Sequence, residues 1–182
     1  MKTCLYTKNH GFFKGKTMGL RMTIIIIITL MLSGCAKVDD MKEIKQIIYT
    51  SNSGTILPEL QWHEEYTIDQ DSVTFRRSGK MENTTVNAGE WQIDVDPDDL
   101  SVLFDQLELL KYQEITKIEP QDIPDGGGSE SIQIVFSNGN SFRMDLTPGV
   151  TYSNGDLIMD PLQSFISELD IPDEAIPQQN VQ

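Results

Sequence analysis

The chain has 182 residues, of which 14 are Lys or Arg and 28 are Asp or Glu, so its formal net charge is −14 at pH 7 and its length suits one globular domain. Five of the cations lie in the first 34 residues, which contain no acid, so the remainder holds nine cations against 28 acids, a charge of −19. An acidic surface of this kind repels phosphate groups, which excludes nucleic acid as a ligand and makes an anionic bilayer a poor one.

The first predicted element is a leader with a short apolar segment. The apolar run, residues 22–32, has 11 residues. This is shorter than the roughly 20 that a membrane-spanning helix needs, but within the roughly 7 to 15 of a secretory signal. The cationic stretch before it is long for a signal, and Met18 offers a later start. We expect residues 1–34 to be a signal peptide, with Met18 as the true start.

Small residues follow the apolar run, and they lead to a cysteine. Leu32-Ser33-Gly34-Cys35 resembles the lipobox of bacterial lipoprotein precursors at every position. The resemblance implies that signal peptidase recognises Leu32, Ser33 and Gly34, that the chain is cut before Cys35, and that the Cys35 thiol carries a lipid. Multiple acyl chains would make this a durable membrane anchor. In a cell with two membranes, Ala36 after the cysteine resembles the pattern of outer-membrane lipoproteins. The alternative is an ordinary cleaved signal.

The only other cysteine, Cys4, lies in the leader, so we expect no disulfide in the mature chain. Residues 35–46 are mostly polar and are expected to be a tether. Residues 47–171 then form one domain, and 172–182 a frayed tail.

The first half of the domain alternates between polar and apolar residues and then changes period. We expect strands over 47–51 and 60–68, a hairpin into 73–75, and a strand over 91–95. An apolar stripe at helical spacing follows, made up of Leu100, Leu103, Phe104, Leu107 and Leu110.

The second half repeats this plan. Residues 132–146 are expected to form a hairpin around Asn138-Gly139, and a helix carries Leu162, Phe165, Ile166 and Leu169. Asp96-Pro97 and Asp160-Pro161 are both expected to open a helix, with aspartate as the cap and proline at the first position. The pattern predicts an α+β domain, in which an antiparallel sheet of hairpins has both helices packed on one face.

Few residues of the mature chain offer catalytic or metal-binding chemistry. The one histidine, His63, begins His63-Glu64-Glu65-Tyr66-Thr67, where threonine replaces the second histidine of a metalloprotease motif. We expect a solvated side chain on an outward strand face. The alternative is a small envelope enzyme that uses Glu64 and Glu65, or an enzyme or calcium-binding domain that uses the carboxylates of Asp94–Asp99 with a metal.

A cluster of acids has the spacing of a calcium loop. It lacks the glycine of the sharp turn and contains a proline, so we interpret it as the cap and first turn of a helix; its members are Asp94, Asp96, Asp98, Asp99 and Asp105.

Two polar connections are the candidate binding surface. These are residues 117–125, which contain Pro120 and Pro124, and residues 148–154; long loops on a rigid scaffold often carry binding. The glycines 126–128 have no lysine after them and no strand before them, so a phosphate loop is not expected.

The order of elements in the mature domain resembles that of small bacterial domains built as hairpin, helix, hairpin, helix, a group that includes the emfourin-type metalloprotease inhibitors. The matching features are the strand with Tyr66-Thr67-Ile68, the stripe ending at Leu110, the hairpin over 131–146 and the helix over 162–169. This implies a binding module, one form of which is a protease inhibitor, and it assigns no inhibitory residue. We therefore predict a lipid-anchored, non-catalytic interaction module of the envelope, on the exported side of the cell or outer membrane. Its partner would be a protein or peptide, and no cofactor is expected.

Overall fold

The computed structural model describes residues 43–82, 84, 86–122 and 124–172. The chain divides after Val38, and every described residue belongs to the second part, 39–182. The predicted signal peptide, the lipobox with Cys35, most of the predicted tether and nearly all of the predicted tail lie outside the described residues.

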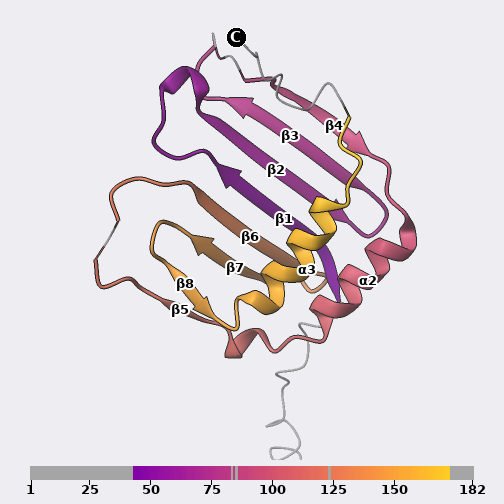
Figure 1. Ribbon diagram of the computed structural model, residues 1–182. Helices are drawn as coiled ribbons and strands as arrows, with labels where there is room; N and C mark the ends of the chain where they lie inside the picture. The colour runs from indigo at the N-terminus through magenta and orange to yellow at the C-terminus, as the bar shows by residue number, and fades with distance from the viewer. Residues whose placement is uncertain (1–42, 83, 85, 123, 173–182) are drawn as a thin grey trace, which may run out of the picture. The chain divides into compact units, whose positions relative to one another are not determined.

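The main element is a six-stranded sheet in the order β4-β3-β2-β1-β6-β7 (Figure 1). Every neighbouring pair is antiparallel. The strands are β1 (Ile44–Asn52), β2 (Trp62–Asp69), β3 (Val73–Gly79), β4 (Gly89–Ile93), β6 (Ser129–Phe136) and β7 (Ser141–Leu146). Because β1 pairs with both β2 and β6, the two halves of the domain form one sheet and share one core.

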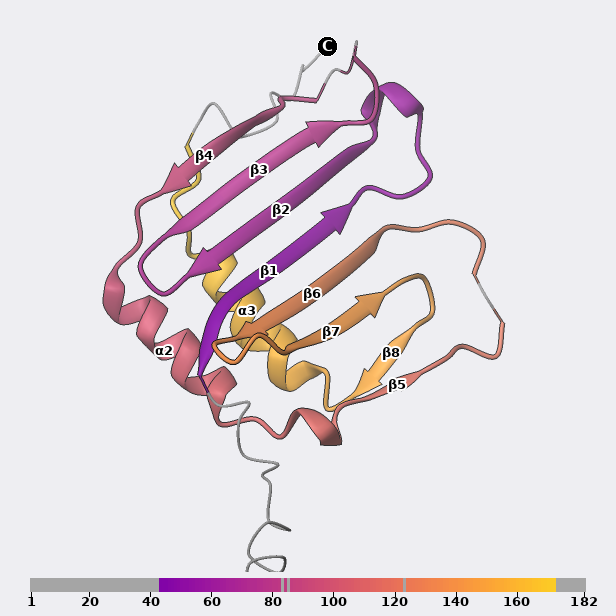
Figure 2. The same cartoon turned by 180° about the vertical axis from the view of Figure 1, so that it is seen from behind.

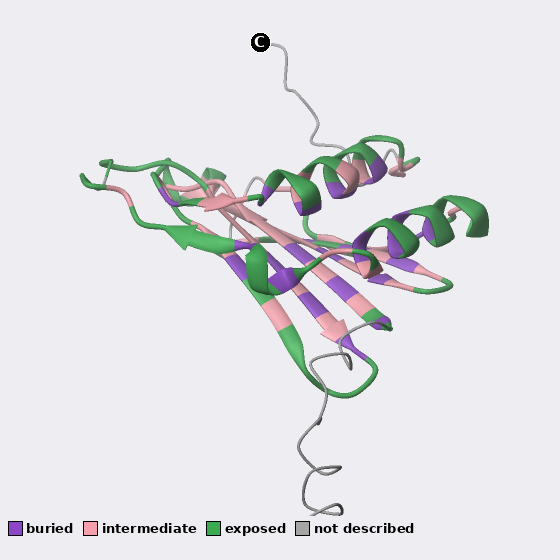
Figure 3. Cartoon of the chain, turned by 90° about the horizontal axis from the view of Figure 1, so that it is seen from below, coloured by how far each residue is buried: buried purple, intermediate pink, exposed green. Residues whose placement is uncertain are grey.

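Two helices, α2 (Pro97–Glu108) and α3 (Asp156–Ser167), lie on the same side of the sheet (Figure 3). The view from behind leaves the opposite face uncovered by helices (Figure 2). The predicted α+β class and the placement of both helices on one face are therefore confirmed. None of the helices among the described residues is both long and apolar enough to span a membrane.

A second, two-stranded sheet was not predicted. It pairs β5 (Thr116–Ile118) with β8 (Thr151–Ser153), two segments of the connections expected to be loops. Short 3₁₀ turns, η1 (Pro58–Leu60) and η2 (Tyr112–Glu114), complete the elements. The two predicted binding loops are thus joined side by side by strand pairing.

The core lies between the helices and the covered face of the sheet. Across this face runs a row of aromatic rings in four adjacent strands, with centroid distances of 6.1, 4.6 and 5.6 Å between successive rings. Aliphatic side chains of β1, β6, α2 and α3 fill the rest, and several of them have no exposed surface. The aromatic row consists of Tyr49, Tyr66, Phe75 and Trp91.

The predicted hairpin between β6 and β7 is confirmed. Gly139 has φ +85°, a value that glycine adopts without a steric cost. Its amide donates to the carbonyl of Phe136, and the amide of Asn140 donates to Asn138 Oδ1 at 2.9 Å. The turn sets the register that places Glu130 of β6 opposite Leu146 of β7.

The two helices begin differently, although the sequence predicts the same start for both. Asp96 caps α2 as expected, because its carboxylate accepts a hydrogen bond from the amide of Asp98 at 2.9 Å. The prediction for α3 is wrong: the helix begins at Asp156, and Pro161 lies inside it. Starting one turn earlier buries Ile158 on the same face as Leu162 and Phe165. The domain boundary also moves, because β1 begins at Ile44, inside the predicted tether.

Candidate binding pocket at the end of the sheet

A polar row lies next to the aromatic row on the covered face of the sheet. In β1, β2 and β3 it lies two residues beyond the aromatic row. Arg77 of β3 pairs with Glu64 of β2, Glu64 with Ser51 of β1, and Ser51 with Glu130 of β6. Two hydroxyl groups of the aromatic row, those of Tyr49 and Tyr66, lie beside these carboxylates, as their electrostatic interactions show. From the aromatic row to the next row, the covered face of the sheet therefore changes from apolar side chains to polar and charged ones.

Glu64 is neutralised within the fold. The guanidinium of Arg77 donates from Nε to Glu64 Oε1 at 2.7 Å, and Nη2 forms an ion pair with the same oxygen. Arg77 is only 8% exposed and lies over the ring of Phe75, 5.1 Å from its centroid. Burial raises the pKa of the neighbouring Tyr66 to about 12; the charge of Glu64 adds to this increase, and Arg77 opposes it.

Glu130 has a different environment. The phenol of Tyr49 is hydrogen-bonded to Glu130 and Ser51, and burial, followed by the charge of Glu130, raises the pKa of Tyr49 well above its ordinary value. None of the ion pairs found among the described residues includes Glu130. This carboxylate therefore has a phenol as a partner where Glu64 has a guanidinium.

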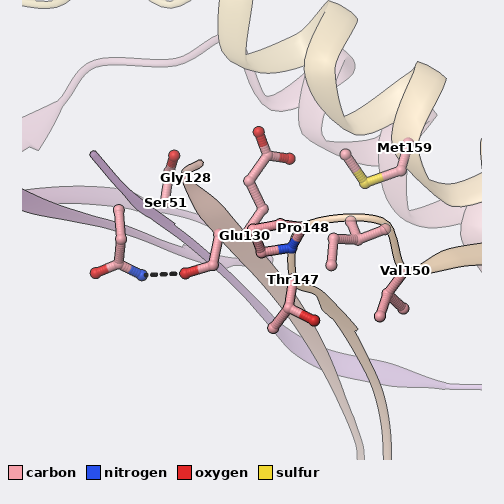
Figure 4. Close-up of a pocket in the computed structure, with 10 residues that line it drawn as sticks. Ser51, Gly128, Glu130, Thr147, Pro148, Val150 and Met159 are labelled. Atoms are coloured by element: carbon pink, nitrogen blue, oxygen red, sulfur yellow. Dashed lines mark hydrogen bonds between the residues drawn. The ribbon is translucent and has the colours of Figure 1, made fainter. Parts of the chain in front are cut away.

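Glu130 stands in a pocket of about 420 Å³ at the end of β1 and β6. Figure 4 shows its side chain rising from β6, between Ser51 on one side and Pro148 and Met159 on the other. One wall is polar and the other is apolar. The polar wall is Ser51 beside the strand-end residues Asn52, Ser129 and Thr147, which also line the open face, and the apolar wall has Leu146, Pro148, Val150 and Met159.

The loop of the apolar wall, part of 148–154, lies against the other predicted loop, 117–125. Gly149 has φ +82°, and a Cβ built there would lie 2.9 Å from Pro124 Cδ and 3.0 Å from Pro120 Cβ. Val150 is buried, and its amide donates to the carbonyl of Thr147. The two segments predicted to carry binding, 117–125 and 148–154, are therefore adjacent, and 148–154 lines the pocket.

The open face of the sheet carries a second polar groove, also of about 420 Å³, that meets the pocket at Asn52, Ser129, Glu130 and Thr147. Its side chains bond to one another. His63 Nδ1 lies 2.9 Å from Asn52 Oδ1, and Arg143 donates from Nε to Asp145 at 2.8 Å. Because these groups already have protein partners, we take the pocket rather than the groove as the candidate site.

The enzyme alternative is not supported at the positions named for it. Glu64 and Glu65 lie on opposite faces of β2, since strand side chains alternate, so they do not form a carboxylate pair. The half-buried His63 has an amide partner rather than a catalytic one. Within the described ranges no group of three or more His, Cys, Asp or Glu side chains is arranged to hold a metal ion, and this covers the region from Asp94 to Asp105.

Sequence reasoning missed Glu130, although a signal was present. Ile132, Ile134 and Phe136 alternate on the buried face of β6, and Glu130 lies in phase with them. An acid in phase with a buried stripe is unusual, because burial disfavours its charge. Ser51 carried no such signal, since its neighbours across the sheet belong to strands that cannot be paired from sequence alone.

Comparisons with known proteins identify no relative. No protein-family model matches the chain, no curated protein matches it, and no solved structure matches it. The resemblances to lipoprotein precursors and to emfourin-type inhibitors stay predictions from the sequence.

Proposed function

We propose that this chain is a lipid-anchored binding module of the bacterial envelope, attached to the cell or outer membrane through Cys35, and that it captures a protein or peptide partner without catalysing a reaction. A protease inhibitor is one version of this function. The observation that carries the binding part is the pocket with one polar and one apolar wall around Glu130. The lipobox residues carry the anchoring part.

The length of the connection supports binding near the membrane. Ile44, where β1 begins, is nine positions after Cys35 in the chain. A chain spans at most about 3.6 Å per residue, so this connection covers roughly 30 Å. An anchored domain would therefore meet partners at the surface of the membrane rather than far from it.

The anchor is tested by substituting its cysteine. Cys35→Ala should leave an uncut precursor that takes up no labelled fatty acid, whereas the unaltered chain begun at Met18 should be processed and labelled. The readouts are intact mass, incorporation of an alkyne fatty acid and partitioning into detergent. A processed and labelled Cys35→Ala protein would contradict the proposal.

Partner capture is tested by cross-linking in intact cells. A photoreactive amino acid at Thr147, an exposed position on the pocket rim, should give a specific adduct that mass spectrometry identifies. The same group at Asp105, an exposed position on α2, serves as the control. An envelope peptidase captured from Thr147 alone would favour the inhibitor version. Identical products from both positions would contradict binding at the pocket.

A further inference from the structure

The strongest unexplained feature of the pocket is the charge of Glu130. Its cross-strand partners are Ser51 and Leu146, and its hydrogen-bond partner is the phenol of Tyr49. None of these groups carries a positive charge. Within the same row, Glu64 meets a guanidinium, so the fold places a cation beside one carboxylate and leaves the other without one among the described ion pairs.

The walls of the pocket limit the ligand. Leu146, Pro148, Val150 and Met159 offer an apolar surface leading toward the carboxylate. A long cationic side chain has the matching form, because Lys and Arg place an aliphatic stem on apolar surface and keep the charge at the tip. An apolar ligand would remove water from Glu130 without replacing its hydrogen bonds, which is costly.

The surrounding charge favours the same ligand. Between residues 43 and 172 the sequence has 24 Asp and Glu against seven Lys and Arg. The field of such a domain attracts cations and repels anions. Ser51, which shares the covered face of the sheet with Glu130, adds an oxygen acceptor that an ammonium or guanidinium group can use in addition to the carboxylate.

We propose that this pocket takes a lysine or arginine side chain of the partner polypeptide, with the cationic group bonded to Glu130 and the methylene stem on Pro148, Val150 and Met159. This inference depends on the proposed function as a binding module, and it names the chemistry of the partner. Glu130 provides the charge, Tyr49 holds the carboxylate in position, and the loop over 147–150 provides the apolar contact.

The test uses the full chain in a non-ionic detergent and three capped peptides. Gly-Gly-Lys-Gly-Gly and Gly-Gly-Arg-Gly-Gly are the ligands, and the same peptide with acetyl-lysine is the uncharged control. Methyl NMR signals of Val150 and Met159 report binding at the pocket. A single side chain should bind with a dissociation constant of about 1 mM. The acetyl-lysine peptide should bind at least about tenfold more weakly.

The matched variants are Glu130→Gln and Glu168→Gln. Each removes one negative charge, but Glu168 is an exposed residue at the far end of α3. Glu130→Gln should weaken binding of the cationic peptides by about tenfold or more with an unchanged melting temperature, and Glu168→Gln by less than about twofold. Raising the NaCl concentration should weaken binding to the unaltered chain.

Three results would overturn the inference: equal binding of the lysine and acetyl-lysine peptides, equal loss in the two variants, or no shift of the Val150 and Met159 signals at peptide concentrations of several millimolar. Failure here is distinguishable from failure of the proposed function. A partner captured from Thr147 in cells together with no binding of either cationic peptide would reject the cation pocket and leave the binding module in place.

Discussion

Glu64 and Glu130 occupy equivalent places in the sheet and have opposite environments. Both lie opposite Ser51, one on each side of β1, and both face the helix-covered side. Glu64 meets the guanidinium of Arg77, while Glu130 meets the phenol of Tyr49 and faces a pocket. The difference shows that the role of an acid on a buried strand face is decided by the strand beside it: β3 supplies an arginine, and β7 supplies a leucine.

The largest expected effect comes from making the same substitution at both positions. Glu64→Gln removes the carboxylate that accepts from Nε of Arg77, a side chain only 8% exposed, and should lower the free energy of unfolding by about 3 kcal/mol. Glu130→Gln removes a charge that has no cationic partner among the described residues and should change stability by less than about 0.5 kcal/mol. Urea denaturation measures both. Equal losses of stability in the two variants would show that Glu64 and Glu130 contribute alike to folding.

A second substitution tests whether the β6–β7 turn maintains the position of Glu130. Gly139→Val places a β-branched residue at φ +85° and should cost about 2 to 3 kcal/mol, because such residues resist this conformation. The β1–β2–β3 part that holds Glu64 is formed by other turns. Thermal melting measures the loss.

The control for this turn is Ser141→Val, which adds the same side chain at an exposed position of β7 and should cost little. A Gly139→Val protein that melts at the unaltered temperature would contradict the turn as the origin of the register.

The phenol of Tyr66, next to Glu64, makes the stability of the fold depend on pH. Burial raises the pKa of Tyr66 to about 12, above the value near 10 of an unfolded chain. The folded state therefore holds this proton more tightly, and its stabilisation is complete below pH 10 and lost as the pH rises toward 12. The loss should be about 3 kcal/mol at most. Denaturation midpoints at pH 9, 10.5 and 11.5 measure it.

Tyr66→Phe is the matched control, because it keeps the ring and removes the proton. The decline in stability between pH 9 and 11.5 should be smaller in this variant than in the unaltered chain. An identical decline in the two proteins would assign the alkaline instability to other groups. Tyr49 and Tyr112, whose pKa values burial also raises, are then the next tyrosines to replace.

The sequence predicts those features that are encoded within a few residues. The Asn138-Gly139 hairpin and the Asp96 cap are local, and both predictions are confirmed. The pairing of β1 with β6 joins residues about 80 positions apart, and no local pattern determines it. The strand β5 is exposed along its length, so it has no alternation to detect. The pocket depends on this long-range pairing, which is why only its 148–154 side was predicted.

Asp96 and Asp160 are a second pair of acids that are alike in sequence and different in structure. Both precede a proline, yet Asp96 caps α2, and Asp160 lies inside α3. Asp96→Ala should cost about 1 kcal/mol through the lost cap, whereas Asp160→Ala should cost nothing or stabilise slightly, because alanine is the better residue in a helix interior. Chemical denaturation of the two variants compares them directly. An equal loss at Asp160 would place the start of the helix at Pro161, as the sequence pattern predicts. It would also remove Met159 from the first turns of α3, and with it one wall of the pocket around Glu130.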